Sequence, residues 1–159
     1  MNAKLLFPSN FKIFGFILFI PSLILLLIEY VYSLDFDSYL SLRVFAIYAE
    51  SIGNNAKFFE IIEDKFMYEL VSIGLILGGI LINFSKLKNE DEYTMQIRYE
   101  SLVWATYFNY GALLFFIIFI YGLPFINVVV LNLYSLLIFF MVRFHYKIFL
   151  LNKSSKDEK

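Results

Sequence analysis

Two glutamates stand near the ends of long apolar segments, where a charged side chain needs a physical reason. Glu29 lies near the end of the apolar run 13–33, and Glu69 lies near the start of the run 66–85. An ionisable group inside a membrane is costly, so it is a functional hypothesis by default. Both side chains are close enough to the ends of their runs to reach the interface by snorkelling. The pattern favours anchoring, with a proton or cation path as the alternative.

Four more ionisable residues gather near the other ends of the apolar runs. Arg98 and Glu100 have no residue of opposite charge three or four positions away, where helical side chains pair. Each must therefore find its partner on another segment, in water or in lipid phosphate. Arg143 and His145 reach the same level on the last apolar run. We predict a polar cluster of these four residues, in which Glu100 pairs with Arg143.

Metal and cofactor chemistry has little support in the sequence. His145 is the single histidine, and the chain has no cysteine, so a zinc site lacks ligands. A haem with two histidine ligands would require a dimer sharing His145. Walker, GxGxxG and Ser–His–Asp patterns are absent from the sequence. We expect no cofactor and no metal, and we favour a non-enzymatic protein; an enzyme would need a deep polar pocket around Asn109, Asn132 and His145.

Uncharged polar residues recur within the apolar runs. Asn109 shares a helical face with Thr106 and Tyr110, and other runs contribute Asn83, Asn127, Asn132 and Ser135. Such side chains commonly join transmembrane helices by hydrogen bonds, and the alternative is a ligand pocket. Gly74 and Gly78 have GxxxG spacing, which lets a neighbouring backbone approach closely. This pair could serve packing within one chain or a homodimer equally well.

The elements that position these residues are membrane spans. The 159 residues are 60% hydrophobic, against about 45–50% in ordinary soluble domains. The excess is gathered into blocks of the roughly 20 residues that cross a bilayer. We predict an all-α integral membrane protein of one domain, with lipid as its main surroundings. The expected spans are 13–33, 66–85, 100–121 and 126–146, and Pro21 should kink the first. The net charge is −1, and the sequence indicates no broad basic surface, so we expect no nucleic acid partner.

The distribution of lysine and arginine predicts the orientation. Ten of the 13 basic residues fall on the side that holds both termini, and three fall on the other side. The more basic side faces the cytoplasm, so both termini are expected inside. The tail 147–159 is then cytoplasmic, and we expect it to be frayed or disordered on the anionic membrane surface.

The loop 34–65 is too long for a bare connection. "LRVFAIYAE" and "AKFFEII" are β-branched and aromatic, and the turn-forming "SIGNN" lies between them. We predict a small β-hairpin, with strands 42–49 and 57–62, on the outer membrane surface. An interfacial amphipathic helix is the alternative.

The charged stretch "SKLKNEDEYTMQIRYE" precedes the third span. Asn89 and Glu92 have the spacing of a capping box, and acidic residues 90–92 would fill the first helical turn. We predict that these acids start a helix, with partner binding, or a metal or acid–base role, as alternatives. A helix over 90–121 would measure about 48 Å, so an extension at 89–100, with its cap, should project beyond the membrane and could bind a partner protein through 90–100. "GLPF" at 122–125 should then break the chain before the fourth span.

A pattern runs through the second half of the chain. It comprises a Ser-Lys stretch, an acidic-Glu-Tyr step, "IRYESLVWA", "YGLPF" and "RFHYKIF", with "VFAIYAE" earlier. This pattern resembles a family of small four-span inner-membrane proteins of flavobacteria and their relatives. The resemblance implies the four-span layout and a bacterial inner membrane. Such proteins often accompany small helix-turn-helix regulators, which points toward signalling.

These expectations lead to one main function and one alternative. The main prediction is a non-enzymatic accessory, sensing or partner-binding subunit that acts through the helix extension 89–100. The alternative is a small oligomeric transporter or channel that uses Glu29, Glu69 and the intramembrane asparagines.

Overall fold

The computed structural model describes residues 6–32, 41–49, 57–87 and 90–157, with only the backbone at Lys57 and at residues 155–157. Four helices make up most of it: α1 (Phe11–Tyr32), α2 (Met67–Phe84), α3 (Glu92–Phe119) and α4 (Leu123–Asp157). All four are long and apolar enough to cross a membrane. The chain is therefore a multi-pass membrane protein, as predicted.

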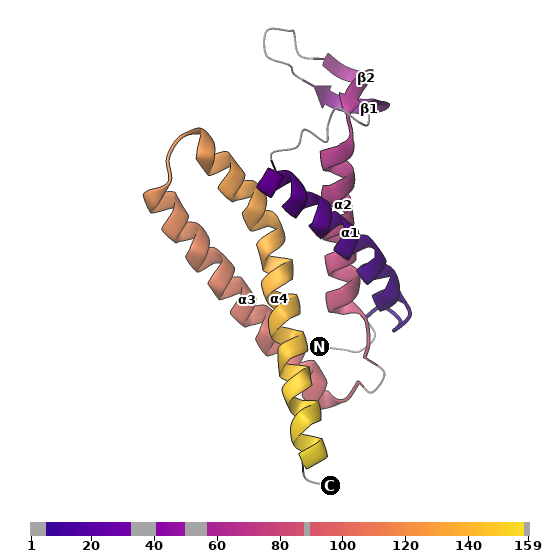
Figure 1. The fold of residues 1–159 in the computed structure, drawn as a ribbon, viewed down its shortest axis with the longest axis vertical. Coiled ribbons are helices and arrows are strands. Elements are labelled where there is room, and N and C mark those ends of the chain that lie inside the picture. Colours follow the sequence, from indigo (N-terminus) through magenta and orange to yellow (C-terminus); the bar gives the residue numbers. More distant parts are fainter. Residues whose placement is uncertain (1–5, 33–40, 50–56, 88–89, 158–159) are drawn as a thin grey trace.

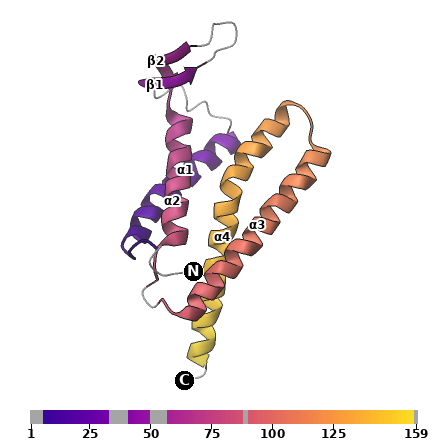
Figure 2. The same ribbon diagram turned by 180° about the vertical axis from the view of Figure 1, so that it is seen from behind.

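The helices alternate in direction, so α1 begins and α4 ends at the same end of the bundle (Figure 1). We call this the terminal end, and we call the opposite end, which carries the two strands, the hairpin end. Seen from behind, α1 crosses α2 obliquely while α4 stands between α2 and α3 (Figure 2). The closest pairs are α1 with α2 and α3 with α4, and α2 with α4 joins the two pairs.

Two apolar clusters hold the bundle together. One contains Phe19 of α1, Leu75 and Ile82 of α2 and Tyr134 of α4. The other joins α3 to α4 near the terminal end through Ile97, Ala105, Phe140 and Phe144. Many large apolar side chains outside these clusters are exposed on the outer faces of the helices. That distribution suits a bundle whose outer surface lies in lipid.

The glycines of α2 explain how α1 approaches so closely. A Cβ atom on Gly78 would lie 2.8 Å from the Phe19 nitrogen and 2.9 Å from the Gly15 oxygen, both on the backbone of α1. A Cβ on Gly74 would collide with the Ser22 side chain of the same helix. The GxxxG face of α2 is therefore covered by α1 within one chain. Of the two interpretations left open by the sequence, the structure shows packing within the chain.

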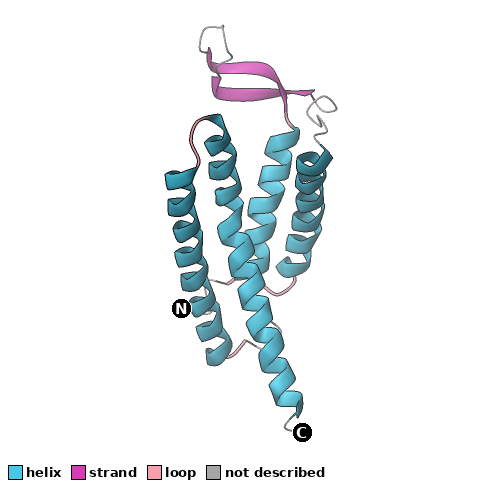
Figure 3. Cartoon of the chain, turned by 60° about the vertical axis from the view of Figure 1, so that its left-hand side comes forward, coloured by secondary structure: helices cyan, strands magenta, loops and turns pink. Residues whose placement is uncertain are grey.

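The predicted hairpin is present at the hairpin end. Strands β1 (Ser41–Ala49) and β2 (Lys57–Lys65) are antiparallel, with Val44 opposite Ile62 and Tyr48 opposite Phe58. An exposed ion pair between Arg43 Nε and Glu63 Oε1, 3.0 Å apart, lies on the ladder. The strands extend across the ends of the helices (Figure 3). The interfacial-helix alternative is wrong for the described strands, and the predicted turn "SIGNN" lies outside the described residues.

Three expectations about the later helices were wrong. The cap of α3 is Asp91, whose carboxylate accepts a 2.7 Å hydrogen bond from the Thr94 nitrogen, and the predicted cap, Asn89, lies outside the described residues. Glu90 precedes the helix instead of filling its first turn. Residues 147–157 of the tail are helical where fraying was expected, because α4 continues to Asp157, and residues 158–159 lie outside the described part. The predicted break is present, with Gly122 at φ 75° between α3 and α4.

Candidate functional site

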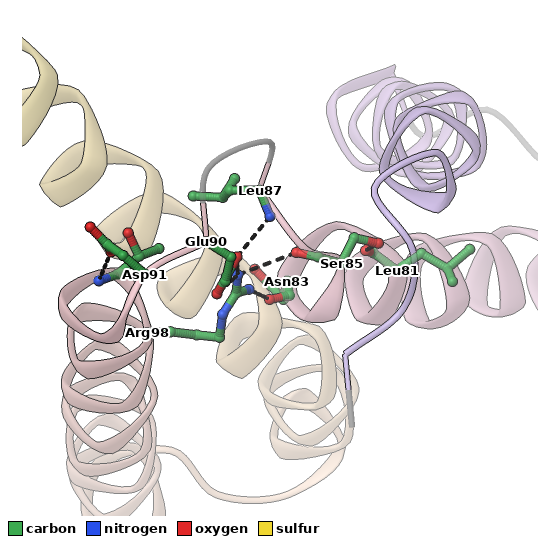
Figure 4. A network of polar contacts seen from close by, with 8 residues as sticks. Leu81, Asn83, Ser85, Leu87, Glu90, Asp91 and Arg98 are labelled. Atoms are coloured by element: carbon green, nitrogen blue, oxygen red, sulfur yellow. Dashed lines mark hydrogen bonds and ion pairs between the residues drawn. The ribbon is translucent and has the colours of Figure 1, made fainter. Parts of the chain in front are cut away.

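Arg98 lies at the centre of a buried polar cluster at the terminal end (Figure 4). Its guanidinium donates hydrogen bonds to the backbone oxygens of Asn83 and Ser85, the latter at 3.2 Å. Its Nη2 atom lies 3.0 Å from both carboxylate oxygens of Glu90. The side chain of Arg98 is only 2% exposed and that of Glu90 only 8%. We call Arg98, Glu90 and the two backbone oxygens the Arg98 cluster.

The end of α2 explains why this cluster forms. The last carbonyls of a helix have no partner within the helix and carry a partial negative charge. Helix α2 ends at Phe84, and Arg98 meets the oxygens of Asn83 and Ser85 at that end. Glu90 balances the arginine and also accepts a 2.7 Å hydrogen bond from the Leu87 nitrogen. The Arg98 cluster therefore caps α2 and fixes the connection to α3.

Two neighbours enclose the cluster. The ring of Phe144 on α4 lies under the guanidinium, 4.3 Å from its carbon to the ring centroid. The segment before α1 also joins here, since the Phe7 nitrogen donates to the Phe84 oxygen and the Lys86 nitrogen donates to the Phe7 oxygen, each at 2.9 Å. All four helices or their flanking segments thus converge on the end of α2.

The other members of the predicted polar cluster form no hydrogen bond or ion pair with Arg98 in the part of the chain that the structure describes. Glu100 is exposed and accepts a 2.9 Å hydrogen bond from Gln96 on its own helix. Arg143 lies over the ring of Trp104, with 4.6 Å from its guanidinium carbon to the centroid. The structure describes both Glu100 and Arg143 and forms no ion pair between them. The predicted pair fails because Glu100 falls outside the face of α3, through Thr94, Arg98 and Ser101, that is buried.

His145 makes a local contact. Its Nδ1 atom lies 2.9 Å from the Met141 oxygen one turn earlier on α4, and Phe144 and Phe16 pack edge-on against its ring. The residue therefore packs α4 against α1 and does not join Glu100 or Arg143.

The intramembrane asparagines join helices. Asn109 of α3 and Asn132 of α4 exchange side-chain hydrogen bonds at 3.3 Å, and Ser135 donates to the same Asn109 oxygen. Asn83 donates from Nδ2 to the Leu137 oxygen at 3.0 Å, which ties α2 to α4. In the structure these side chains have the geometry of interhelical hydrogen bonds. Neither of the two hollows described below is lined by Asn109, Asn132 or His145.

A cavity of about 780 Å³ opens between α1, α2 and α4 at the hairpin end. Glu29 and Tyr30 of α1, Tyr68 and Ser72 of α2, and Asn127 and Tyr134 of α4 contribute its polar atoms. Ser72 Oγ and Tyr134 Oη are 2.6 Å apart and hydrogen-bonded. Glu69 is exposed on α2 and is not part of the lining described. The structure therefore separates the two glutamates that the sequence analysis grouped.

Sequence reasoning named Glu29 but missed its surroundings. Ser72 and Tyr134 are polar residues within apolar runs, so each carried a signal. They meet because α2 packs against α4, and the spacing of residues within α2 or within α4 does not predict that contact.

A second hollow, of about 470 Å³, lies at the terminal end between the start of α3 and the last part of α4. Its lining combines apolar and charged side chains: Tyr93, Ile97 and Glu100 of α3, and Lys147, Leu150, Leu151, Lys153 and Ser154 of α4. We call it the terminal groove. The part of the predicted extension that lies in α3, residues 92–100, therefore forms one wall of a groove between two helices.

Comparison of the chain with protein-family models, curated proteins and solved structures finds no match. The structure has four helices long and apolar enough to cross a membrane, and the comparisons identify no family.

Proposed function

We propose that this chain is a non-enzymatic accessory or sensing subunit that binds a partner protein through the terminal groove. The observation that carries the proposal is the length of α3 and α4, which together form the terminal groove. Helix α4 has 35 residues and α3 has 28, which correspond to about 52 Å and about 42 Å. The hydrocarbon core is about 30 Å thick. Both helices are thus long enough to continue into water at the terminal end.

The chemistry of the groove supports an amphipathic helix as the occupant. Ile97, Leu150 and Leu151 supply an apolar floor, as expected for a helix that docks its apolar face. Lys147 and Lys153 on α4 supply positive charge at the edge. A partner helix with apolar residues on one face and acidic residues beside them would complement this surface.

The same proposal includes a location. The excess of lysine and arginine at the terminal end supports a cytoplasmic position for both termini and for the groove. The resemblance in the sequence supports a bacterial inner membrane. The partner would then be a cytoplasmic protein or the cytoplasmic segment of another membrane protein.

Two tyrosines of the extension allow a matched test. Tyr93 lines the terminal groove and is 55% exposed, whereas Tyr99, on the same extension, is 59% exposed and is not in the lining described. The tagged full chain would be extracted from its native membrane in polymer nanodiscs. Co-extracted proteins would be quantified by mass spectrometry for wild type, Tyr93→Ala and Tyr99→Ala.

The expected result is a stoichiometric partner that Tyr93→Ala loses about tenfold, corresponding to about 1.4 kcal/mol, and Tyr99→Ala retains. Thermal unfolding of each variant separates lost binding from lost folding. A chain that is extracted alone, or only with further copies of itself, would contradict the proposal. So would equal retention of the partner by both variants.

The alternative function is a small oligomeric transporter or channel. Its support is the cavity that contains Glu29. It also needs Glu69, Asn109 and Asn132 along the same path, and these lie elsewhere: Glu69 is exposed, and the asparagines are bonded to one another between α3 and α4. Binding within the cavity therefore has better support than passage through it.

A further inference from the structure

The cavity at the hairpin end combines one carboxylate with three phenol rings in apolar surroundings. Among the described residues that line it, Glu29 alone carries a charge. Tyr30, Tyr68 and Tyr134 supply the rings, and Leu26, Val71 and Val130 contribute to the apolar wall. The chemistry of such a lining restricts which ligands it can hold.

The lining residues extend from the ends of α1 and α2 toward the interior of the bundle. Glu29 lies three residues before the end of α1, and Tyr68 is the second residue of α2. Tyr134 lies eleven residues into α4, which is about 17 Å along the helix. Tyr134 is 6% exposed, so its hydrogen bond to Ser72 lies away from the surface. A ligand could keep a polar group near the interface and an apolar group deeper in the bundle.

The charge of Glu29 selects the sign of the ligand. A carboxylate in surroundings of low polarity attracts a cation more strongly than it would in water. The rings of tyrosine favour cations as well, and organic ammonium groups are recognised by such aromatic sites. A metal cation such as Ca²⁺ would require six to eight oxygen ligands, and Glu29 is the single carboxylate among the described lining.

We propose that this cavity binds an organic ammonium ion that carries an apolar substituent. Glu29 pairs with the ammonium, and the apolar wall takes up the substituent. Two sources share this chemistry: a free amphiphilic amine and the headgroup of phosphatidylethanolamine. The proposal concerns the opposite end of the molecule from the terminal groove and does not depend on it.

The test uses benzyltrimethylammonium and its uncharged isostere neopentylbenzene. The full chain in maltoside micelles would be dialysed to equilibrium against each tritiated probe. Glu29→Gln removes the charge, and Glu69→Gln is the matched control, because Glu69 is also at the hairpin end but outside the described lining. Val130→Trp fills the cavity and leaves the carboxylate in place.

Glu29→Gln should weaken binding of benzyltrimethylammonium about tenfold and leave neopentylbenzene unaffected. Val130→Trp should weaken both probes, and Glu69→Gln should change neither. Equal binding of the ammonium by wild type and Glu29→Gln would overturn the proposal. So would equal losses in Glu29→Gln and Glu69→Gln. Thermal unfolding of each variant excludes a loss of binding that only reflects misfolding.

A second measurement distinguishes the two sources. Lipids that remain with wild type and Glu29→Gln after extraction in polymer nanodiscs would be quantified by mass spectrometry. Enrichment of phosphatidylethanolamine on wild type, reversed by benzyltrimethylammonium, identifies the headgroup as the occupant. Equal lipid on both proteins, together with ammonium binding, identifies a free amine.

Discussion

Arg98 and Glu29 lie at opposite ends of the bundle, and their surroundings differ in kind. The guanidinium of Arg98 meets two backbone oxygens, one carboxylate and one aromatic ring, and its side chain is 2% exposed. Glu29 is half-buried in the lining of a cavity of about 780 Å³. Arg98 is enclosed by the groups that it contacts, whereas Glu29 lines a space that a ligand can enter.

In a small membrane protein, a charge that stabilises the fold can be separated from a charge that is available to a ligand by the space around it. Both residues are charged and lie in or beside apolar runs, so the sequence alone makes each of them an equal candidate for a functional site. The surrounding volume distinguishes them. Removing Arg98 should therefore damage the fold, while removing the charge of Glu29 should damage binding.

The largest effect is expected from Arg98→Met. The substitution leaves Glu90 buried without its counter-charge and frees the oxygens at the end of α2. Breaking a buried pair in this way costs about 3–5 kcal/mol. Thermal and denaturant unfolding in micelles would measure the loss. The double variant Arg98→Met, Glu90→Leu should recover much of it, because no buried charge remains; equal stability of the single variant and wild type would refute the structural role.

A smaller loss of stability is expected from Gly78→Ala, because the space around Gly78 is already filled by α1. A Cβ on Gly78 would press on backbone atoms of α1 at 2.8 Å and 2.9 Å, so Gly78→Ala should cost up to about 3 kcal/mol. Gly111→Ala is the matched control, since a Cβ there would meet nothing within 4 Å. Unfolding midpoints of the two variants would be compared. If both glycines tolerate alanine equally, the close contact of α1 and α2 is not what holds them together.

The smallest effect should come from protonation of Asp91, the exposed carboxylate that caps α3. Hydrogen bonds from the side chain and the backbone of Thr94 hold the pKa of Asp91 below its usual value. A lowered pKa in the folded state means that the cap contributes above the unfolded value, about 3.9, and is lost as the pH falls through the folded value. Asp91→Asn keeps a capping residue that does not titrate. On acidification from pH 7 to about 3 the unfolding temperature of wild type should fall more than that of the variant; parallel curves would contradict this.

The large elements could be predicted because each has a local cause. The spans follow from apolar runs of sufficient length, and the hairpin follows from two β-branched and aromatic stretches around a turn sequence. The extent of α4 was missed although a signal existed. Phe144, Ile148 and Leu151 recur at spacings of four and three, and all three pack in the cluster with α3.

The Arg98 cluster could not be predicted by the same means. Side chains three and four positions apart can pair only where both lie on the same helix. Arg98 has no acidic residue at those positions. Glu90 lies eight positions earlier, before α3 begins, where the chain has turned back toward the end of α2. The cavity around Glu29 depends likewise on contacts among three helices. Such sites follow from tertiary geometry, and no single run of sequence contains them.

The capping of α2 by Arg98 also sets an order of events during synthesis. The helical pair of α1 and α2 is complete by residue 84, but the group that satisfies its last oxygens arrives only with residue 98, in the second turn of α3. During translation the first two spans therefore enter the membrane with one end unfinished. Arrival of the third helix closes that end, beside the N-terminal segment whose Phe7 already pairs with Phe84 and Lys86.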